Sequence, residues 1–360
     1  MKNIIKALVV FASVVAFSSA NAGDLTVTGT AKATYNIQSS DSATARSNAG
    51  KGLGITNELA FTGTGELDNG WSWKYQVELD DNATGGTTSD DTRLEMTTPY
   101  GTVAAYNTEG SLNTKYKFSQ AAYGAGSDNG ASGLMQYGTS IDSYNNLQYH
   151  TPSGLLPYST SIKVAYAPSA DSAKASGNAS GTQNTAENGT DVKQVQVTST
   201  PMDGFNLGAS YLEKTNENGV RGYEMGGVYG TYAYGPFSAG YGVHGISNNA
   251  QSTAIAKATA LTATTAKNVK TYENQAYSLA FAVNDDLTVS YEVEESTAKK
   301  RGIDVSGSTK LDVDLEVSTM QAAYTMGGMT MSLSHKGIEN SAYALGVDSK
   351  ETLFVVALAF

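Results

Sequence analysis

The chain has 360 residues, a formal net charge of -11 and no cysteine, and only 16% of its residues are charged. The acidic balance argues against nucleic acid as a partner, because phosphate backbones attract clustered Lys and Arg. The lack of cysteine argues against a disulfide-stapled secreted domain. The charged fraction lies below the roughly one quarter that is typical of soluble domains. This deficit suits a chain whose outer face meets lipid, and it suits a secreted Gly/Ser-rich filament or adhesin equally well.

The N-terminal segment 1–22 has the pattern of a secretory signal peptide. Lys2 and Lys6 accompany an apolar run, and Ala20-Asn21-Ala22 supplies the small residues of a cleavage site. We therefore predict that 1–22 is removed and that 23–360 forms a single domain.

Beyond the signal peptide, no apolar run approaches the roughly 18 residues that a membrane helix needs. The chain instead shows short segments in which apolar and polar residues alternate, the period of a β-strand. These predicted strands cover 24–37, 52–67, 71–80, 91–98, 102–107, 144–151, 158–167, 191–200, 205–214, 222–234, 237–246, 271–283, 287–295, 311–326, 329–336 and 351–360. A membrane-spanning form of such a chain would be a closed β-barrel, which satisfies its own backbone hydrogen bonds.

The connections between these strands alternate between short and long along the chain. Every second connection is a short Gly/Pro/Asp turn, such as 68–70 or 99–101, and the others are long and polar, such as 108–142 and the low-complexity 168–190. A β-sandwich has no reason to sort its connections in this way. The pattern predicts an all-β fold: a transmembrane antiparallel β-barrel of about sixteen strands, with short periplasmic turns and long extracellular loops.

The last predicted strand runs to the chain end. Phe354, Val356, Leu358 and Phe360 share one face, so that a large aromatic residue carries the terminal carboxylate. Chain ends usually fray into water, and an apolar face of this kind is expected to be covered by lipid or by another strand. It resembles the C-terminal strand of Gram-negative outer-membrane β-barrels, which implies that Phe360 is read by the barrel assembly machinery.

Two internal segments carry a wider resemblance. The runs Asn145–Gly154 (NNLQYHTPSG) and Met320–Thr330 (MQAAYTMGGMT), together with the signal peptide, the order of the loops and Phe360, resemble the general diffusion porins of proteobacteria over the whole mature chain. The resemblance implies a sixteen-stranded, water-filled barrel in the outer membrane, in contact with lipid and lipopolysaccharide. It also implies that the third long loop, 108–142, folds into the pore, and that three copies associate through their early strands as a homotrimer.

Alternation along the strands predicts which charged side chains line the interior. With the apolar face outward, the charged residues that point inward are Lys32, Glu58, Lys74, Glu78, Arg93, Glu95 and Lys163. In the porin family, bases on the wall face acids on the inward loop. The resemblance therefore nominates Lys32, Lys74 and Arg93 as the bases, and Glu109 and Asp128 as the loop acids. This loop departs from the usual pattern because it also carries Lys115 and Lys117.

Enzyme motifs are nearly absent from the sequence. His150, His244 and His335 lie on different predicted strands, and no metalloprotease, P-loop or nucleophile-elbow pattern occurs. Asp80-Asp81 and Asp90-Asp91 could attract hard cations, but solvated loop edges explain them, so we predict no cofactor and no metal site.

The sequence favours a porin that passes small hydrophilic solutes and ions without covalent chemistry. Its net acidic charge predicts a weak preference for cations. Two alternatives stay open: a non-channel barrel that acts as an adhesin or structural anchor, and a barrel hydrolase whose Ser, His and acid come from separate strands.

Overall fold

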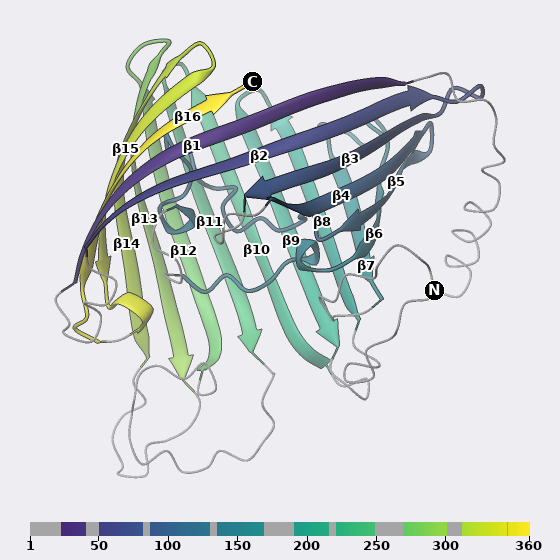
Figure 1. Ribbon diagram of the computed structural model, residues 1–360. Coiled ribbons are helices and arrows are strands. Elements are labelled where there is room, and N and C mark those ends of the chain that lie inside the picture. The colour runs from purple at the N-terminus through teal and green to yellow at the C-terminus, as the bar shows by residue number, and fades with distance from the viewer. Residues whose placement is uncertain are drawn as a thin grey trace.

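The structure is a computed structural model that describes residues 23–40, 50–81, 87–129, 135–168, 191–215, 221–248, 269–300, 312–343 and 345–360. The predicted signal peptide, 1–22, lies outside the described residues. Within them the chain forms sixteen antiparallel strands, which confirms the predicted fold class (Figure 1). The strands are β1 Asp24–Ser40, β2 Gly50–Glu66, β3 Ser72–Asp81, β4 Thr87–Thr98, β5 Gly101–Asn107, β6 Asn146–His150, β7 Ser161–Ala167, β8 Val192–Met202, β9 Phe205–Thr215, β10 Arg221–Tyr234, β11 Phe237–Asn248, β12 Val269–Ala282, β13 Leu287–Lys300, β14 Val313–Met326, β15 Met329–Glu339 and β16 Ser349–Ala359.

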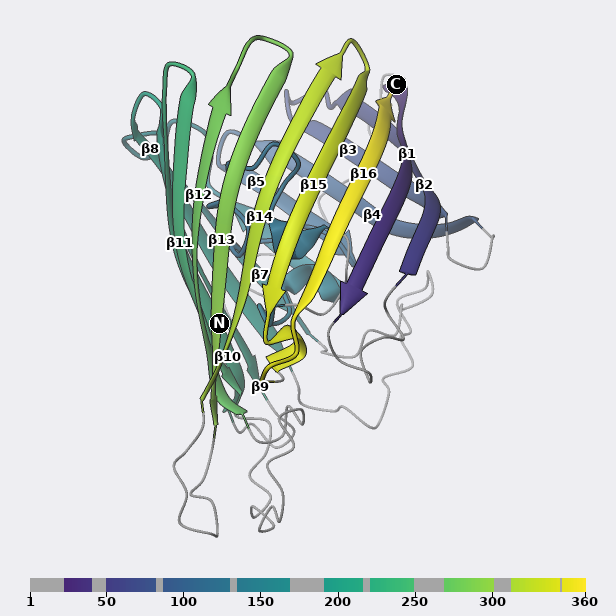
Figure 2. The same cartoon turned by 90° about the vertical axis from the view of Figure 1, so that its left-hand side faces the viewer.

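The sheet closes on itself through its first and last strands. β1 pairs with β16 from Thr30↔Ala359 to Ser40↔Ser349, so every strand has two hydrogen-bonded neighbours. The chain end completes this ladder, because Gly29 N donates to Phe360 O (2.8 Å) and Phe360 N donates to Gly29 O (3.0 Å). Figure 2 shows β16 lying between β15 and β1 at this seam. Closure removes the free sheet edges that would otherwise expose unpaired backbone groups.

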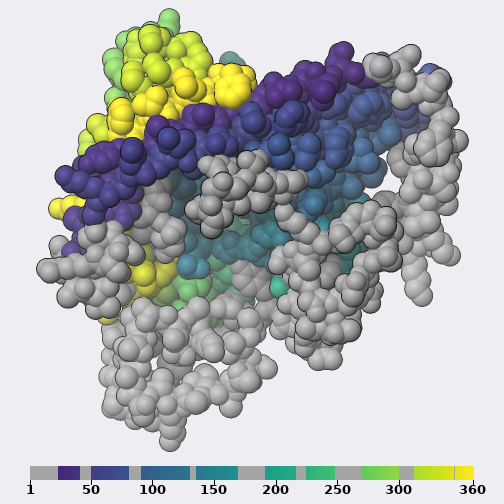
Figure 3. Space-filling view, viewed as in Figure 1, coloured from purple at the N-terminus to yellow at the C-terminus, as the bar shows by residue number. Residues whose placement is uncertain are grey.

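The outer face of the barrel carries the apolar half of each alternating strand. Leu53 and Ile55 in β2 are 80% and 70% exposed, and Leu279 in β12 and Phe354 in β16 are also exposed. Their neighbours in sequence point to the interior. The space-filling view shows the first two strands crossing the face of the molecule as one continuous wall (Figure 3).

The connections follow the predicted sorting, with three exceptions in length. The turn-side connection 151–160 has ten residues, because β7 begins at Ser161 and not at residue 158, and two loop-side connections are short. Two-residue turns join β4 to β5, β8 to β9, β10 to β11 and β14 to β15, on the rim where the C-terminus lies (Figure 1). The connections 82–86 and 216–220, which were predicted to be among the long loops, are no longer than the turn at 67–71. They are short because the paired strands run further than predicted; β4, for example, begins at Thr87 and not at residue 91.

The rule of apolar outside and polar inside reverses near the loop-side end of β14. Val313, Leu315 and Val317 are completely buried on the inner face, whereas Asp314 and Glu316 point outward. The inner face of the same strand continues with Gln321, which bonds to the chain inside the barrel. The interior is therefore packed with protein at this level.

Helical structure among the described residues is limited to short 3-10 turns, including η2 Gly126–Asp128, η3 Ile141–Ser143 and η6 Ser341–Tyr343. None of the helices found in the described ranges is long and apolar enough to cross a membrane.

Candidate functional site

The connection between β5 and β6, residues 108–145, lies inside the barrel, as predicted for the third long loop. We call it loop 3; residues 130–134 of it are not described. Thr114 Oγ1 lies 2.9 Å from Ser210 Oγ in β9, Gln120 N donates to Ser278 Oγ in β12 (2.8 Å), and Asn274 Nδ2 donates to Gln136 O (2.8 Å). Loop 3 is therefore fastened to the inner faces of β8–β15, which we call the anchoring wall.

Two acids of β13 hold the tip of loop 3. Glu292 accepts hydrogen bonds from Gly126 N (2.8 Å) and Ser119 Oγ (2.6 Å). Glu294 accepts from Ser127 N (2.7 Å), Ser127 Oγ (2.5 Å) and Tyr137 Oη (2.8 Å). Both carboxyls are almost fully buried, and none of the described ion pairs includes either of them. Uncharged donors of loop 3 therefore satisfy these acids, and removing the acids would leave the donors unpaired.

A third attachment lies at the barrel seam. Lys336 in β15 and Glu351 in β16 form a fully buried ion pair (2.8 Å), and Lys336 Nζ also donates to Asn129 O of loop 3. Glu351 accepts further hydrogen bonds from Asn36 (3.1 Å) and Gln38 (2.6 Å) of β1. One network thus ties together β15, β16, β1 and loop 3.

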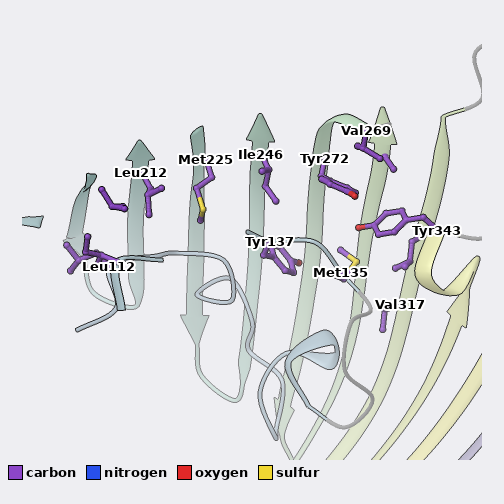
Figure 4. Packing of buried hydrophobic residues seen from close by; sticks show 14 of the residues in the cluster. Leu112, Met135, Tyr137, Leu212, Met225, Ile246, Val269, Tyr272, Val317 and Tyr343 are labelled. Atoms are coloured by element: carbon purple, nitrogen blue, oxygen red, sulfur yellow. The ribbon is translucent and has the colours of Figure 1, made fainter. Parts of the chain in front are cut away.

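Apolar packing completes the anchoring wall. Leu112, Met135 and Tyr137 of loop 3 belong to one buried cluster with inward residues of β7–β15 and with Tyr343 of η6 (Figure 4). The wall residues labelled in the figure are Leu212, Met225, Ile246, Val269, Tyr272 and Val317. The cluster explains why the loop-side part of β14 is apolar on its inner face.

The opposite inner face, formed by β3–β7, carries charge and borders open space. We call it the charged wall. A cavity of about 610 Å³ lies between it and the start of loop 3. The charged groups that line this cavity are Lys74, Asp91, Arg93, Glu95, Glu109, Asp142 and Lys163. Any solute in this cavity meets side chains of both signs.

Arg93 is at the centre of an ion-pair network. Its guanidinium lies 2.9 Å from Glu109 of loop 3 and 3.7 Å from Glu78 of β3. Burial raises the pKa of the Glu109 carboxyl to about 7 although Arg93 opposes the shift, and the nearby acids Glu78, Asp91 and Glu95 raise it further. The charge of Glu109 therefore changes close to neutral pH.

Uncharged groups complete the cavity wall. Tyr106 Oη donates to Glu95 (2.9 Å), and the His150 ring Nε2 lies 2.8 Å from Gln148 Oε1. No group of three or more His, Cys, Asp or Glu side chains in the described part of the chain is arranged to hold a metal ion.

The structure brings together most, but not all, of the residues predicted to line a constriction. One cavity is lined by five of them, Lys74, Arg93, Glu95, Glu109 and Lys163. Glu78 lies beside this cavity as an ion-pair partner of Arg93. The other three, Lys32 in β1, Glu58 in β2 and Asp128 in η2, are exposed and do not border this cavity.

Sequence reasoning missed the acids that hold loop 3. Glu292 and Glu294 share the inward face of their strand, a signal that alternation alone could have found. Lys336 and Glu351 are direct partners in the register of β15 and β16, and pairing the last two predicted strands could have found them.

Comparison with known proteins assigns the family. A sequence profile of the Gram-negative porins matches residues 7–335, and the chain belongs to this family. No curated protein sequence matches the chain.

Solved structures of low sequence identity share the fold. A loop L8 deletion mutant of OmpT, an outer membrane protein of Vibrio cholerae, is 12% identical with a TM-score of 0.65, over 94% of this chain and 100% of that chain. A mutant of the porin of Rhodopseudomonas blastica is 15% identical with a TM-score of 0.59, over the same shares. These likenesses support the barrel architecture alone.

Proposed function

We propose that this chain is an outer-membrane porin that forms a water-filled channel for passive diffusion of small hydrophilic solutes and ions. The observation that carries the proposal is that the middle of loop 3, from Thr114 to Tyr137 in its described residues, is attached to one side of the barrel. The loop is fixed to the anchoring wall, and the space left beside it is bordered by partly exposed charged side chains. Charged residues around a narrow opening select ions by sign, and its size limits the solutes.

The chemistry that we propose is diffusion without covalent catalysis. Lys74, Glu78, Arg93, Glu95, Glu109 and Lys163 act as the lining of the narrow region, and Lys32, Glu58 and Asp128 line the passage on either side of it. A weak preference for cations follows from the net charge of -11. Equal permeability to K⁺ and Cl⁻ would contradict that preference.

The surroundings that we propose follow from the family and the outer surface. The protein sits among outer-membrane lipid and lipopolysaccharide after the barrel assembly machinery has read the strand that ends in Phe360. Early strands form the contact of a homotrimer, consistent with the very exposed apolar side chains Leu25, Leu53 and Ile55 on β1 and β2.

Single-channel recording of the refolded protein in a planar bilayer under a salt gradient tests the proposal. We expect stepwise conductance, with steps in threes for a trimer, and a reversal potential that gives the sign of the ion preference. Folded protein without conductance would contradict the channel and favour the adhesin, anchor or hydrolase alternatives.

A further inference from the structure

The cavity at the charged wall contains two lysines that form no ion pair with any other described residue. Arg93 is engaged by Glu78 and Glu109. Lys163, by contrast, makes no ion pair or hydrogen bond within the described part of the chain, although it is half-buried. Its partners in the neighbouring strands are His150 and Gln196, and neither is a carboxylate.

Lys74 is the second such lysine in the cavity. It lies opposite Glu95 in the β3–β4 ladder, but no ion pair joins them, and Glu95 accepts its hydrogen bond from Tyr106. Lys117 of loop 3 is exposed and adds a further positive charge near Lys163. The Glu95 carboxylate also acts on Lys163 through space, but no ion pair or hydrogen bond joins the two, so this half-buried ammonium can still bind an anionic group from outside.

The same cavity has an unused acid. Asp142 of η3 lines it and makes no ion pair or hydrogen bond to any other described residue. Asp91, which also lines the cavity, is engaged by a hydrogen bond from Thr108. A free carboxylate and free ammonium groups are therefore both available to one solute.

These opposite charges are separated along the strands. Lys74 and Lys163 each lie two residues from the turn-side ends of β3 and β7, which begin at Ser72 and Ser161. Asp142 lies four residues before the loop-side start of β6 at Asn146, and the adjacent Ile141 N donates to Gln194 near the loop-side start of β8. Since the turns gather on one rim (Figure 1), the free positive charge lies toward the turn rim and the free negative charge toward the loop rim.

We propose that this cavity is a subsite for small zwitterions, such as amino acids, with the ammonium group at Asp142 and the carboxylate at Lys163, supported by Lys74. The inference rests on the proposed channel function and specifies its solute class. A zwitterion makes charge-assisted hydrogen bonds at both ends, whereas a neutral polyol makes neither. The cavity volume of about 610 Å³ holds the solute together with water. A solute that stays hydrated in this way is bound weakly enough to leave the subsite again.

The test is the interruption of single-channel current by added solutes. The mature full-length protein in a planar bilayer is titrated with 4-aminobutyric acid, with the neutral four-carbon polyol erythritol and with butyrate. We expect 4-aminobutyric acid to block half of the current at a concentration at least tenfold lower than either of the others. Lys163→Gln and Asp142→Asn should each raise its half-blocking concentration at least fivefold. Lys350→Gln, which removes an exposed lysine of β16, should leave it unchanged.

Three outcomes would overturn the proposal. Equal block by erythritol would mean that charge plays no part. Equal block by butyrate, with no effect of Asp142→Asn, would mean a plain anion site. Folded protein without any current before solute is added would refute the channel itself, and the subsite with it; the first two outcomes leave the channel standing.

Discussion

The two sides of the barrel interior use charged residues in different ways. On the anchoring wall, Glu292, Glu294 and the Lys336–Glu351 pair are buried, and loop 3 or a neighbouring strand satisfies them. On the charged wall, Lys74 and Lys163 border open space, and neither is in any ion pair among the described residues. Charges of the first kind hold a shape, and charges of the second kind remain available to solutes.

This difference indicates that removing a charge has a different consequence on each wall. A buried charge that loses its partner is costly, because neither water nor another group replaces the lost interaction. A charge that borders an aqueous cavity keeps its hydration, so its removal changes the local potential more than the stability. The following substitutions test this comparison, from the largest expected effect to the smallest.

Lys336→Ala should have the largest effect on stability. It leaves Glu351 buried without its cation and removes the donor to Asn129 O, so we expect a loss of about 3–5 kcal/mol of unfolding free energy. Urea unfolding in detergent or lipid measures this loss. Lys350→Ala, at an exposed position of the next strand, is the matched control, and equal unfolding midpoints for the two variants would contradict the structural role of Lys336.

Glu294→Gln should loosen loop 3. The amide replaces one acceptor oxygen with a donor, so Ser127 and Tyr137 compete for the remaining oxygen, at a cost of about 1–3 kcal/mol. We expect noisier single-channel current and faster proteolysis within loop 3. The control is Glu295→Gln, which changes the adjacent, outward-pointing residue. It should show the same current noise and the same proteolysis of loop 3 as the unsubstituted protein. Quiet current and intact loop 3 in Glu294→Gln would show that the acid does not anchor the loop.

Arg93→Gln should change ion preference more than stability. It leaves Glu78 and Glu109 without their cation beside the cavity. One unit charge at roughly 6 Å in water amounts to about 0.7 kcal/mol, or about a threefold change in a local ion ratio. We expect the cation-to-anion permeability ratio, obtained from the reversal potential, to rise about threefold. A shift toward anions would contradict the placement of Arg93 at the opening.

Ionisation of Glu109 should make the ion preference depend on pH. Because the pKa of its carboxyl is raised to about 7, cation preference should increase between pH 6 and pH 8 as the charge appears. Folding stability has the opposite trend. Between the ordinary value of 4.5 and about 7, the unfolded chain releases a proton that the folded chain keeps, so stability decreases as pH rises through this window.

Glu109→Gln is the corresponding variant. It should show a reversal potential that is flat across pH 6–8, measured at constant salt. A pH dependence that survives the substitution would assign the titration to another group.

The sequence predicted the barrel because its signals are local. Alternation, turn residues and the terminal Phe360 each follow from the geometry of a single strand or turn. The loop-side part of β14 shows where this reasoning ends. Val313, Leu315 and Val317 alternate with Asp314 and Glu316. The rule that apolar residues face outward therefore predicts the wrong face for these three residues. Their true direction depends on the buried cluster that Met135 and Tyr137 join only when loop 3 folds inward.

The candidate site was predicted on one wall and missed on the other. Inward charges on neighbouring strands identified Arg93 and Lys163, because adjacent strands share a surface. The partners of Glu292 and Glu294 are backbone N–H groups and hydroxyls of a loop about 170 residues earlier in the chain. Nothing local in the sequence specifies such a pairing.

The most direct test of the account is a crosslink between loop 3 and the anchoring wall. The chain has no cysteine of its own, and Thr114 Oγ1 lies 2.9 Å from Ser210 Oγ. With Thr114→Cys and Ser210→Cys in one chain, we predict that a disulfide forms in the folded protein and that single-channel conductance is the same before and after its reduction. Failure of the two thiols to join, or loss of conductance in the oxidised protein, would contradict the claim that the opening lies along the charged wall.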